Sequence, residues 1–168
     1  RVEGWASYVA GVAWALAEDG HRLPGLDVVV DGRVPLGSGL SSSAALICST
    51  ALAMCAAAGV EVDRPSLVRA TMRAESEIAG APTGGLDQTI ALLGEPDHAL
   101  LIDFRDHGTR KVPWRPAEAG LTLLVVDTRA THAHSDGGYG QRRADCEEAA
   151  RVLEVTTLRE ASPDQVES

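Results

Sequence analysis

Aromatic residues are scarce in this 168-residue chain, which has one Phe, two Tyr and three Trp. A hydrophobic content of 45% still suffices for a core, and that core must be mostly Ala, Val and Leu. Basic residues are also few: 15 Lys and Arg stand against 24 Asp and Glu, for a net charge of −9. This balance argues against nucleic acid or an anionic membrane as a partner.

Cysteine is limited to Cys48, Cys55 and Cys146, an odd number without the spacing of a metal site. We therefore expect reduced, mostly packed thiols in a cytoplasmic protein. We also expect a monomer. The sequence shows no signal peptide and no apolar run of membrane-spanning length. The chain starts at Arg1 and enters a helical pattern almost at once, so we expect a piece of a longer protein.

Five segments carry apolar residues at helical spacing, and four short apolar runs are typical of strands. The predicted helices cover 4–18, 44–58, 63–80, 86–93 and 142–153, and the predicted strands cover 26–34, 99–104, 110–114 and 121–127. This order predicts an α+β fold, in which helices cover one side of a mixed sheet.

Small residues fill the junction between the first predicted strand and the second predicted helix, which reads Pro-Leu-Gly-Ser-Gly-Leu-Ser-Ser-Ser-Ala-Ala over 35–45. We call residues 37–43 the serine bend. Its glycines allow a ligand to approach the backbone, and its serines stand where a helix leaves N–H groups unpaired. Such a turn binds anions, above all phosphate. The alternative is a Ser-capped helix without a ligand. No Gly-Lys-Ser/Thr follows, which excludes the usual P-loop, and a Rossmann motif fits poorly.

This stretch resembles the nucleotide-binding motif of the GHMP kinases, and its three-serine form with a preceding Pro-Leu is most similar to the galactokinases. The resemblance implies that ATP is bound by Gly37, Ser38, Gly39, Leu40, Ser41, Ser42 and Ser43. It also implies the two-domain kinase fold. Residues 1–120 would form most of an N-terminal domain like ribosomal protein S5 domain 2, and 121–168 the start of the C-terminal domain.

Asp87 follows a second small-residue loop and precedes an apolar helix, in the order Gly-Gly-Leu-Asp-Gln. The pattern resembles the galactokinase loop that ends in Gly-Ile-Met-Asp-Gln. The resemblance implies that Asp87 accepts the proton of the sugar hydroxyl at C1, a role that needs a carboxylate close to the phosphate site. The alternative is that Asp87 is an N-cap residue without chemistry.

Glu75 lies twelve residues before Asp87, where the family has a Mg²⁺-binding Glu. The resemblance implies that Glu75 and Ser43 hold Mg²⁺ together with the ATP phosphates, a hard-oxygen set that suits this ion. A single acid on a helix is also typical of a solvated surface, and we assign that reading to Glu77.

Tyr139 precedes Arg-Arg and Cys-Glu pairs, an arrangement that resembles the sugar-contacting Tyr loop of galactokinases. The resemblance implies that Tyr139 hydrogen-bonds the sugar and that the backbone at Gly84 approaches it. A Tyr in a Gly-rich loop can equally be a surface residue.

The resemblance thus implies a galactokinase, which makes galactose 1-phosphate and ADP from α-D-galactose and ATP. The family's catalytic Arg and half of its sugar pocket have no counterpart in this sequence, so we expect residues 1–168 alone to be inactive. Two alternatives remain open. One is a sugar 1-kinase for N-acetylgalactosamine or arabinose. The other is a non-catalytic galactose and ATP sensor, although such sensors have a shortened Ser-Ser-Ser-Ala stretch and here it is complete.

Overall fold

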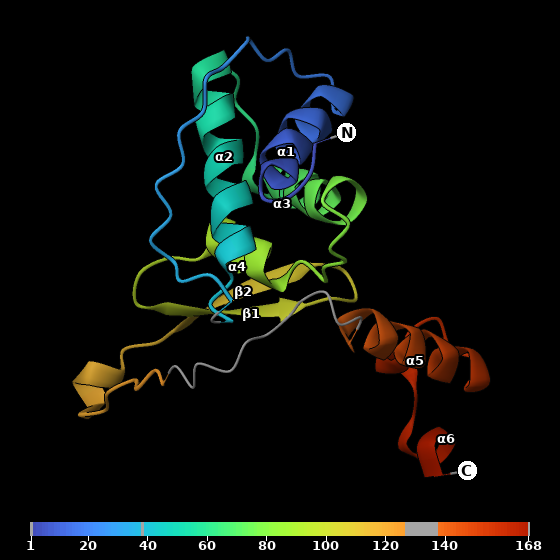
Figure 1. Ribbon diagram of the computed structural model, residues 1–168. Helices are drawn as coiled ribbons and strands as arrows, with labels where there is room; N and C mark the ends of the chain where they lie inside the picture. The colour runs from blue at the N-terminus through green and yellow to red at the C-terminus, as the bar shows by residue number, and fades with distance from the viewer. Residues whose placement is uncertain (1, 38, 127–137, 168) are drawn as a thin grey trace. The chain divides into compact units, whose positions relative to one another are not determined.

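The computed structural model describes residues 2–37, 39–126 and 138–167, with the side chains of residues 138, 139 and 167 left out (Figure 1). The chain forms two compact units, Arg1–His132 and Ala133–Ser168, which are described separately. The domain boundary expected at residues 120 and 121 stays a prediction.

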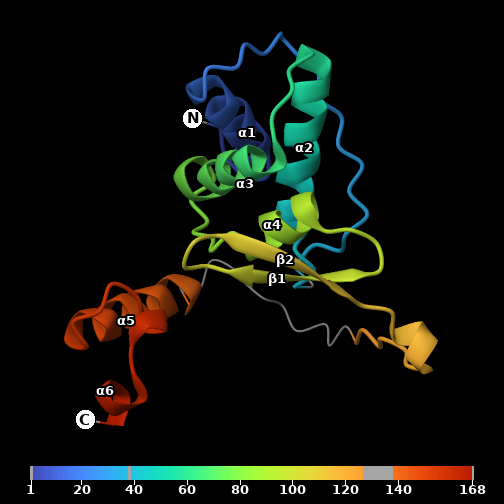
Figure 2. The same ribbon diagram turned by 180° about the vertical axis from the view of Figure 1, so that it is seen from behind.

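The first unit consists of helices followed by a β-hairpin. Its helices are α1 (Ala6–Glu18), α2 (Ser42–Ala58), α3 (Arg64–Arg73) with its π-helical continuation η1 (Ala74–Ile78), and α4 (Leu86–Leu93). Strands β1 (His98–Asp103) and β2 (Gly108–Pro113) pair antiparallel, with His98 opposite Pro113. A short 3₁₀ turn, η2 (Pro116–Ala119), follows. In both views the helices lie on one side of the hairpin, with α4 next to β1 (Figures 1 and 2).

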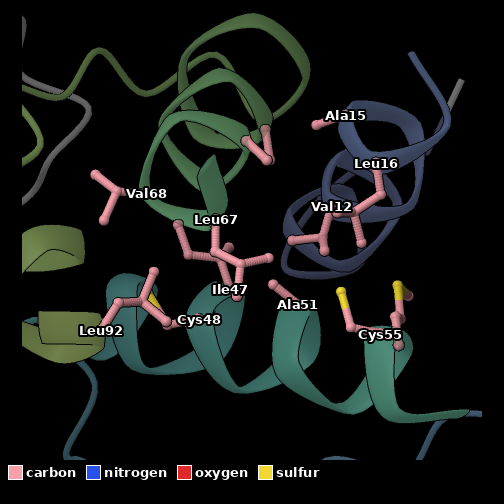
Figure 3. Close-up of a cluster of buried hydrophobic side chains, with 13 residues drawn as sticks. Val12, Ala15, Leu16, Ile47, Cys48, Ala51, Cys55, Leu67, Val68 and Leu92 are labelled. Atoms are coloured by element: carbon pink, nitrogen blue, oxygen red, sulfur yellow. The ribbon is translucent and has the colours of Figure 1, made fainter. Parts of the chain in front are cut away.

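Helix α2 is the centre of the core because it is apolar on nearly every side. Figure 3 shows Val12 and Leu16 of α1 and Leu67 of α3 pointing toward Ile47 and Ala51 of α2, and all five side chains are fully or almost fully buried. Each large side chain buried in this way stabilises the fold by about 1.5–3 kcal/mol. The core is thus built from closely packed aliphatic residues in place of aromatic ones.

Gly11 lets α1 approach η1 more closely than any other residue would. A Cβ atom at this position would lie 2.8 Å from the carbonyl oxygen of Ala74 and 3.1 Å from Cβ of Ile78. Helix α1 therefore packs directly on the backbone of η1. This contact matters for function because η1 carries Glu75.

The predicted strand over 26–34 is wrong, and the predicted mixed sheet is a two-stranded antiparallel sheet. Residues 26–34 are extended without strand pairing, and Val29 is 95% exposed. An apolar run forms a strand only when a neighbour accepts and donates its backbone hydrogen bonds. None of the segments that the structure describes lies alongside 26–34 in this way.

The predicted strand over 121–127 is also wrong as far as the structure describes it, because 121–126 is extended, unpaired and exposed. The same physical reason applies, since alternation and hydrophobicity do not supply a partner. The other expectations fare better. The predicted helices and the hairpin strands are confirmed within a few residues, and so is the α+β class.

The second unit contains α5 (Gly138–Val152), the 3₁₀ turn η4 (Leu158–Glu160) and α6 (Pro163–Glu167). Helix α5 confirms the helix predicted at 142–153 and carries ion pairs along its surface: Arg143 contacts Glu147 at 2.9 Å, and Arg151 contacts Glu148 at 2.6 Å. No helix in the described ranges is both long and apolar enough to cross a membrane.

Candidate active site

The serine bend leads into α2 through a left-handed backbone. Gly37 and Gly39 have φ of 71°, and Ser41, the N-cap residue, has φ 59° and ψ 42°. A left-handed conformation is costly for a residue with a side chain and is often found where function requires it. Ser41 makes no side-chain cap hydrogen bond. The first N–H groups of α2, at Ser42 and Ser43, have no acceptor within the helix and are suited to an anion.

The bend is open to solvent over most of its length. Leu40 is 48% exposed, Gly39 is exposed, and the three serines are half-buried. Ser38 lies outside the described residues. Ser41 occupies the N-cap position of α2 without a side-chain cap hydrogen bond, which does not match the alternative of a helix capped by a serine side chain. The bend therefore remains a candidate phosphate site.

Asp87 is the second residue of α4, and the N-cap position belongs to Gly85, which has φ 83°. The hydroxyl of Thr83 accepts the N–H of Gly85 at 3.1 Å. The alternative that Asp87 caps α4 is therefore wrong. Its half-buried carboxylate stands in the first turn, where the helix dipole favours negative charge.

Glu75 is a buried acid, so the solvated alternative is wrong for this residue. It is 6% exposed and accepts a hydrogen bond from Nε2 of Gln88, which is itself 1% exposed. Its π-helical position is unusual, and single π turns are frequent at functional sites. Glu77 faces outward and contacts Nε of Arg73 at 3.4 Å, as expected for the surface acid.

The negative charges of Glu75 and Asp87 both act on one side chain of α2, the thiol of Cys48. Burial raises the pKa of the Cys48 thiol to about 11, opposed by a hydrogen bond with Thr71 and reinforced by the negative charges of Glu75 and Asp87. Burial also raises the pKa of Tyr8, and the negative charge of Glu75 raises it further. For Cys55, seven residues further along α2, burial alone raises the pKa. Both carboxylates therefore lie within electrostatic reach of the half of α2 that starts at the serine bend.

The length of α2 between Ser43 and Cys48 shows how far Cys48 lies from the serine bend. Cys48 is five residues after Ser43, which corresponds to about 7.5 Å along a helix axis. The N-terminal end of α2 lies beside α4 in both views (Figures 1 and 2). The serine bend thus leads into the end of α2 that packs beside α4, and α4 carries Asp87 and contacts Glu75 through Gln88.

The donor set at this end fits Mg²⁺. Glu75 offers a buried carboxylate and Ser43 a half-buried hydroxyl, both hard oxygen donors. The described residues contain no cluster of three or more His, Cys, Asp or Glu side chains able to hold a metal by themselves. Mg²⁺ commonly uses one or two protein ligands and completes its shell with phosphate oxygens and water.

The structure says less about the two residues assigned to the sugar, Gly84 and Tyr139. Gly84 is exposed in the loop before α4. Tyr139 belongs to the first turn of α5, and its side chain lies outside the described residues. Two hollows of about 500 and 340 Å³ lie elsewhere. Helix α3 lines the first and α1 the second, and neither includes the serine bend, Glu75 or Asp87.

Sequence reasoning missed Gln88 and Thr83. Both belong to the hydrogen-bonded surroundings of Glu75, since Oγ1 of Thr83 lies 3.3 Å from Oε1 of Gln88. The only sequence signal was the position of Gln88 directly after Asp87 in the loop pattern.

Comparisons with known proteins point to one family. The chain is 49% identical over 159 residues to the galactokinase of Mycobacterium tuberculosis strain H37Rv, covering 95% of this chain and 44% of that protein. It is 48% identical over 158 residues to the galactokinase of Streptomyces coelicolor, covering 94% of this chain and 41% of that protein. The chain thus spans less than half the length of these relatives.

A solved structure shares the fold. A crystal structure of Lactococcus lactis galactokinase complexed with galactose superposes with a TM-score of 0.82 at 24% identity, over 99% of this chain and 44% of that chain. Residues 7–95 match the sequence profile of the GHMP kinases N terminal domain, and this range holds the serine bend, Glu75 and Asp87. The chain therefore belongs to the GHMP kinase family.

Proposed function

We propose that the natural protein containing this chain transfers the γ-phosphoryl group of ATP to the C1 hydroxyl of α-D-galactose. The observation that carries the proposal is that α2, which begins at the serine bend, packs beside α4, which carries Asp87 and bonds the buried Glu75 through Gln88. The similarity to galactokinases of Mycobacterium and Streptomyces supports the choice of substrate. We expect a monomeric, cytoplasmic enzyme.

The reaction is a direct displacement at phosphorus. The C1 oxygen forms a bond to the γ-phosphorus, the bond to the β–γ bridging oxygen breaks, and ADP leaves. The hydroxyl proton passes to the Asp87 carboxylate and then to water. Such transfers depend mainly on positioning and charge stabilisation. The residues assigned to the phosphates are Gly37, Ser38, Gly39, Leu40, Ser41, Ser42 and Ser43.

Glu75 and Ser43 would hold the metal. When bound, Mg²⁺ neutralises charge on the transferred phosphoryl group. On the sugar side, we assign backbone contact to Gly84 and a hydrogen bond to Tyr139, and Asp87 contacts the hydroxyl that reacts. These assignments leave the rest of the sugar pocket to parts of the natural protein beyond this sequence.

The test is an assay of the longest natural chain that contains this sequence, with Mg-ATP and a panel of sugars. We expect an anomeric phosphate by ³¹P NMR with galactose, and smaller rates with N-acetylgalactosamine and arabinose. A clear preference for either of those sugars would replace galactose as the substrate. Binding of both ATP and galactose without turnover would instead identify a sensor.

A further inference from the structure

Gln88 is a buried polar residue for which the proposed reaction has no role. It is 1% exposed, and burial of an amide is costly unless its groups are hydrogen-bonded. Its partners are the Glu75 carboxylate and the Thr83 hydroxyl. Gln88 follows Asp87 directly in α4, so one turn of helix carries both a contact to Glu75 and the proposed base.

The hydrogen bonds have a defined direction. The Gly85 N–H donates to Oγ1 of Thr83 at 3.1 Å, and this leaves the Thr83 hydroxyl to donate to Oε1 of Gln88 at 3.3 Å. Nε2 of Gln88 then donates to Oε2 of Glu75. An ionised carboxylate only accepts, so it selects one orientation of the Gln88 amide, and Thr83 reinforces that orientation.

We propose that Gln88 is a positioning residue, which holds the Glu75 carboxylate in the orientation that binds the metal and fixes it relative to Asp87. The inference rests on the proposed function, because it assigns Glu75 to the metal. Glu75 belongs to η1 and Asp87 to α4, and no helix joins the two directly. The hydrogen bonds from Gly85 through Thr83 and Gln88 to Glu75 supply that link.

The chemistry favours such a support. A glutamate has several rotatable bonds, and a carboxylate that binds a metal is oriented by the group that bonds its second oxygen. Removal of such a partner commonly weakens metal binding or activity by about 10–100-fold. Thr71 and Thr89, which are also buried, bond backbone carbonyls through their hydroxyls, so they have a local structural role that Gln88 does not share.

The test measures metal binding directly. The longest natural chain is titrated with Mn²⁺ in the presence of ADP, and free Mn²⁺ is followed by electron paramagnetic resonance. We expect the Gln88→Met variant, which keeps the length but loses the donor, to bind Mn²⁺ about 10-fold more weakly. Gln141→Met is the matched control, because Gln141 is exposed on α5. It should leave Mn²⁺ binding unchanged.

Thr83 provides a second variant. Thr83→Val removes the hydroxyl at nearly constant shape and should weaken Mn²⁺ binding about threefold, whereas Thr83→Ser keeps the hydroxyl and should restore it. If Gln88→Met fails to fold, the comparison of Thr83→Val with Thr83→Ser tests the proposal instead. Wild-type Mn²⁺ affinity in a folded Gln88→Met variant, or equal affinities in Thr83→Val and Thr83→Ser, would overturn the inference. Lack of turnover by the wild-type enzyme would overturn the proposed function itself.

Discussion

Helices α3 and α4 both begin near an aspartate, and the two helix starts are built differently. Asp63 is the N-cap residue of α3 and accepts the N–H of Ser66 at 2.9 Å and its hydroxyl at 2.6 Å. At the start of α4 the N-cap position is taken by Gly85, whose N–H bonds Thr83, and Asp87 follows two residues later. The Asp63 carboxylate is therefore used by its own helix, whereas Asp87 is not the cap of α4.

The difference shows how similar sequence patterns acquire different roles. The hydrogen bonds from Ser66 lower the pKa of Asp63 and hold it ionised as part of the helix. The charge of Asp87 instead acts outside its own helix, on Cys48 of α2. An aspartate at a helix start is available for chemistry when another group performs the capping.

The largest expected effect comes from exchanging the carboxylate of Asp87 for an amide. Asp87→Asn should lower kcat by about 10³-fold, because general-base catalysis typically contributes 10²–10⁴-fold. The fold should remain, since Asn fits the same space in the first turn. Steady-state kinetics and thermal unfolding of the longest natural chain measure both effects.

Asp63→Asn is the matched control, because Asn caps a helix about as well as Asp. It should leave kcat unchanged and lower Tm only slightly, because the amide oxygen still accepts the N–H of Ser66 but the negative charge is lost. A loss of only a few-fold in Asp87→Asn would reduce Asp87 to a binding residue and remove the contrast between the two helix starts.

A smaller effect is expected from the glycine that starts α4. Gly85 has φ 83°, and a Cβ atom there would lie 2.4 Å from Sδ of Met72. Gly85→Ala should lower the free energy of unfolding by about 1–3 kcal/mol, from backbone strain together with the smaller cost of displacing the flexible end of Met72. It should also lower kcat, because Asp87 and Gln88 would shift with the helix start. Chemical denaturation and kinetics measure the two losses.

Gly80→Ala separates the two causes. Gly80 also has positive φ, at 74°, but nothing lies within 4 Å of a Cβ atom there. Its loss should be confined to backbone strain, about 1–2 kcal/mol, without an effect on kcat. Equal losses at both positions would show that the contact with Met72 does not position α4.

Much of this arrangement could be predicted from the sequence, because helices are local. The apolar spacing in 4–18, 44–58 and 63–80 depends on residues a few positions apart, and the structure has α1, α2 and α3 there. The strand at 26–34 could not be judged in the same way. Its valines have the right pattern, but pairing depends on a partner strand that local sequence does not specify.

The surroundings of the candidate site illustrate the same limit. The hydrogen bond between Gln88 and Glu75 joins residues 13 positions apart in two different helices, so no local sequence pattern predicts it. The π turn that carries Glu75 lies where α1 packs on the backbone through Gly11, which is a tertiary contact. The family resemblance identified Asp87 and Glu75 as residue types, and the structure adds what orients them.

The smallest effect is expected from removing the cap at Asp63. Asp63→Ala should lower Tm by about 2–4 °C at neutral pH, because the N–H of Ser66 loses its acceptor, and should leave kcat unchanged. The pH dependence has a definite sign. The folded state lowers the pKa of Asp63 below its ordinary value of 3.8, so the ionised cap stabilises the fold fully above that value. The stabilisation is lost as the pH falls through the lower, folded-state pKa.

The difference in Tm between wild type and Asp63→Ala should therefore be constant from pH 7 to 5 and shrink below about pH 4. A difference that stays constant in acid would mean that the charge of Asp63 contributes nothing to the start of α3, and its contrast with Asp87 would then rest on geometry alone.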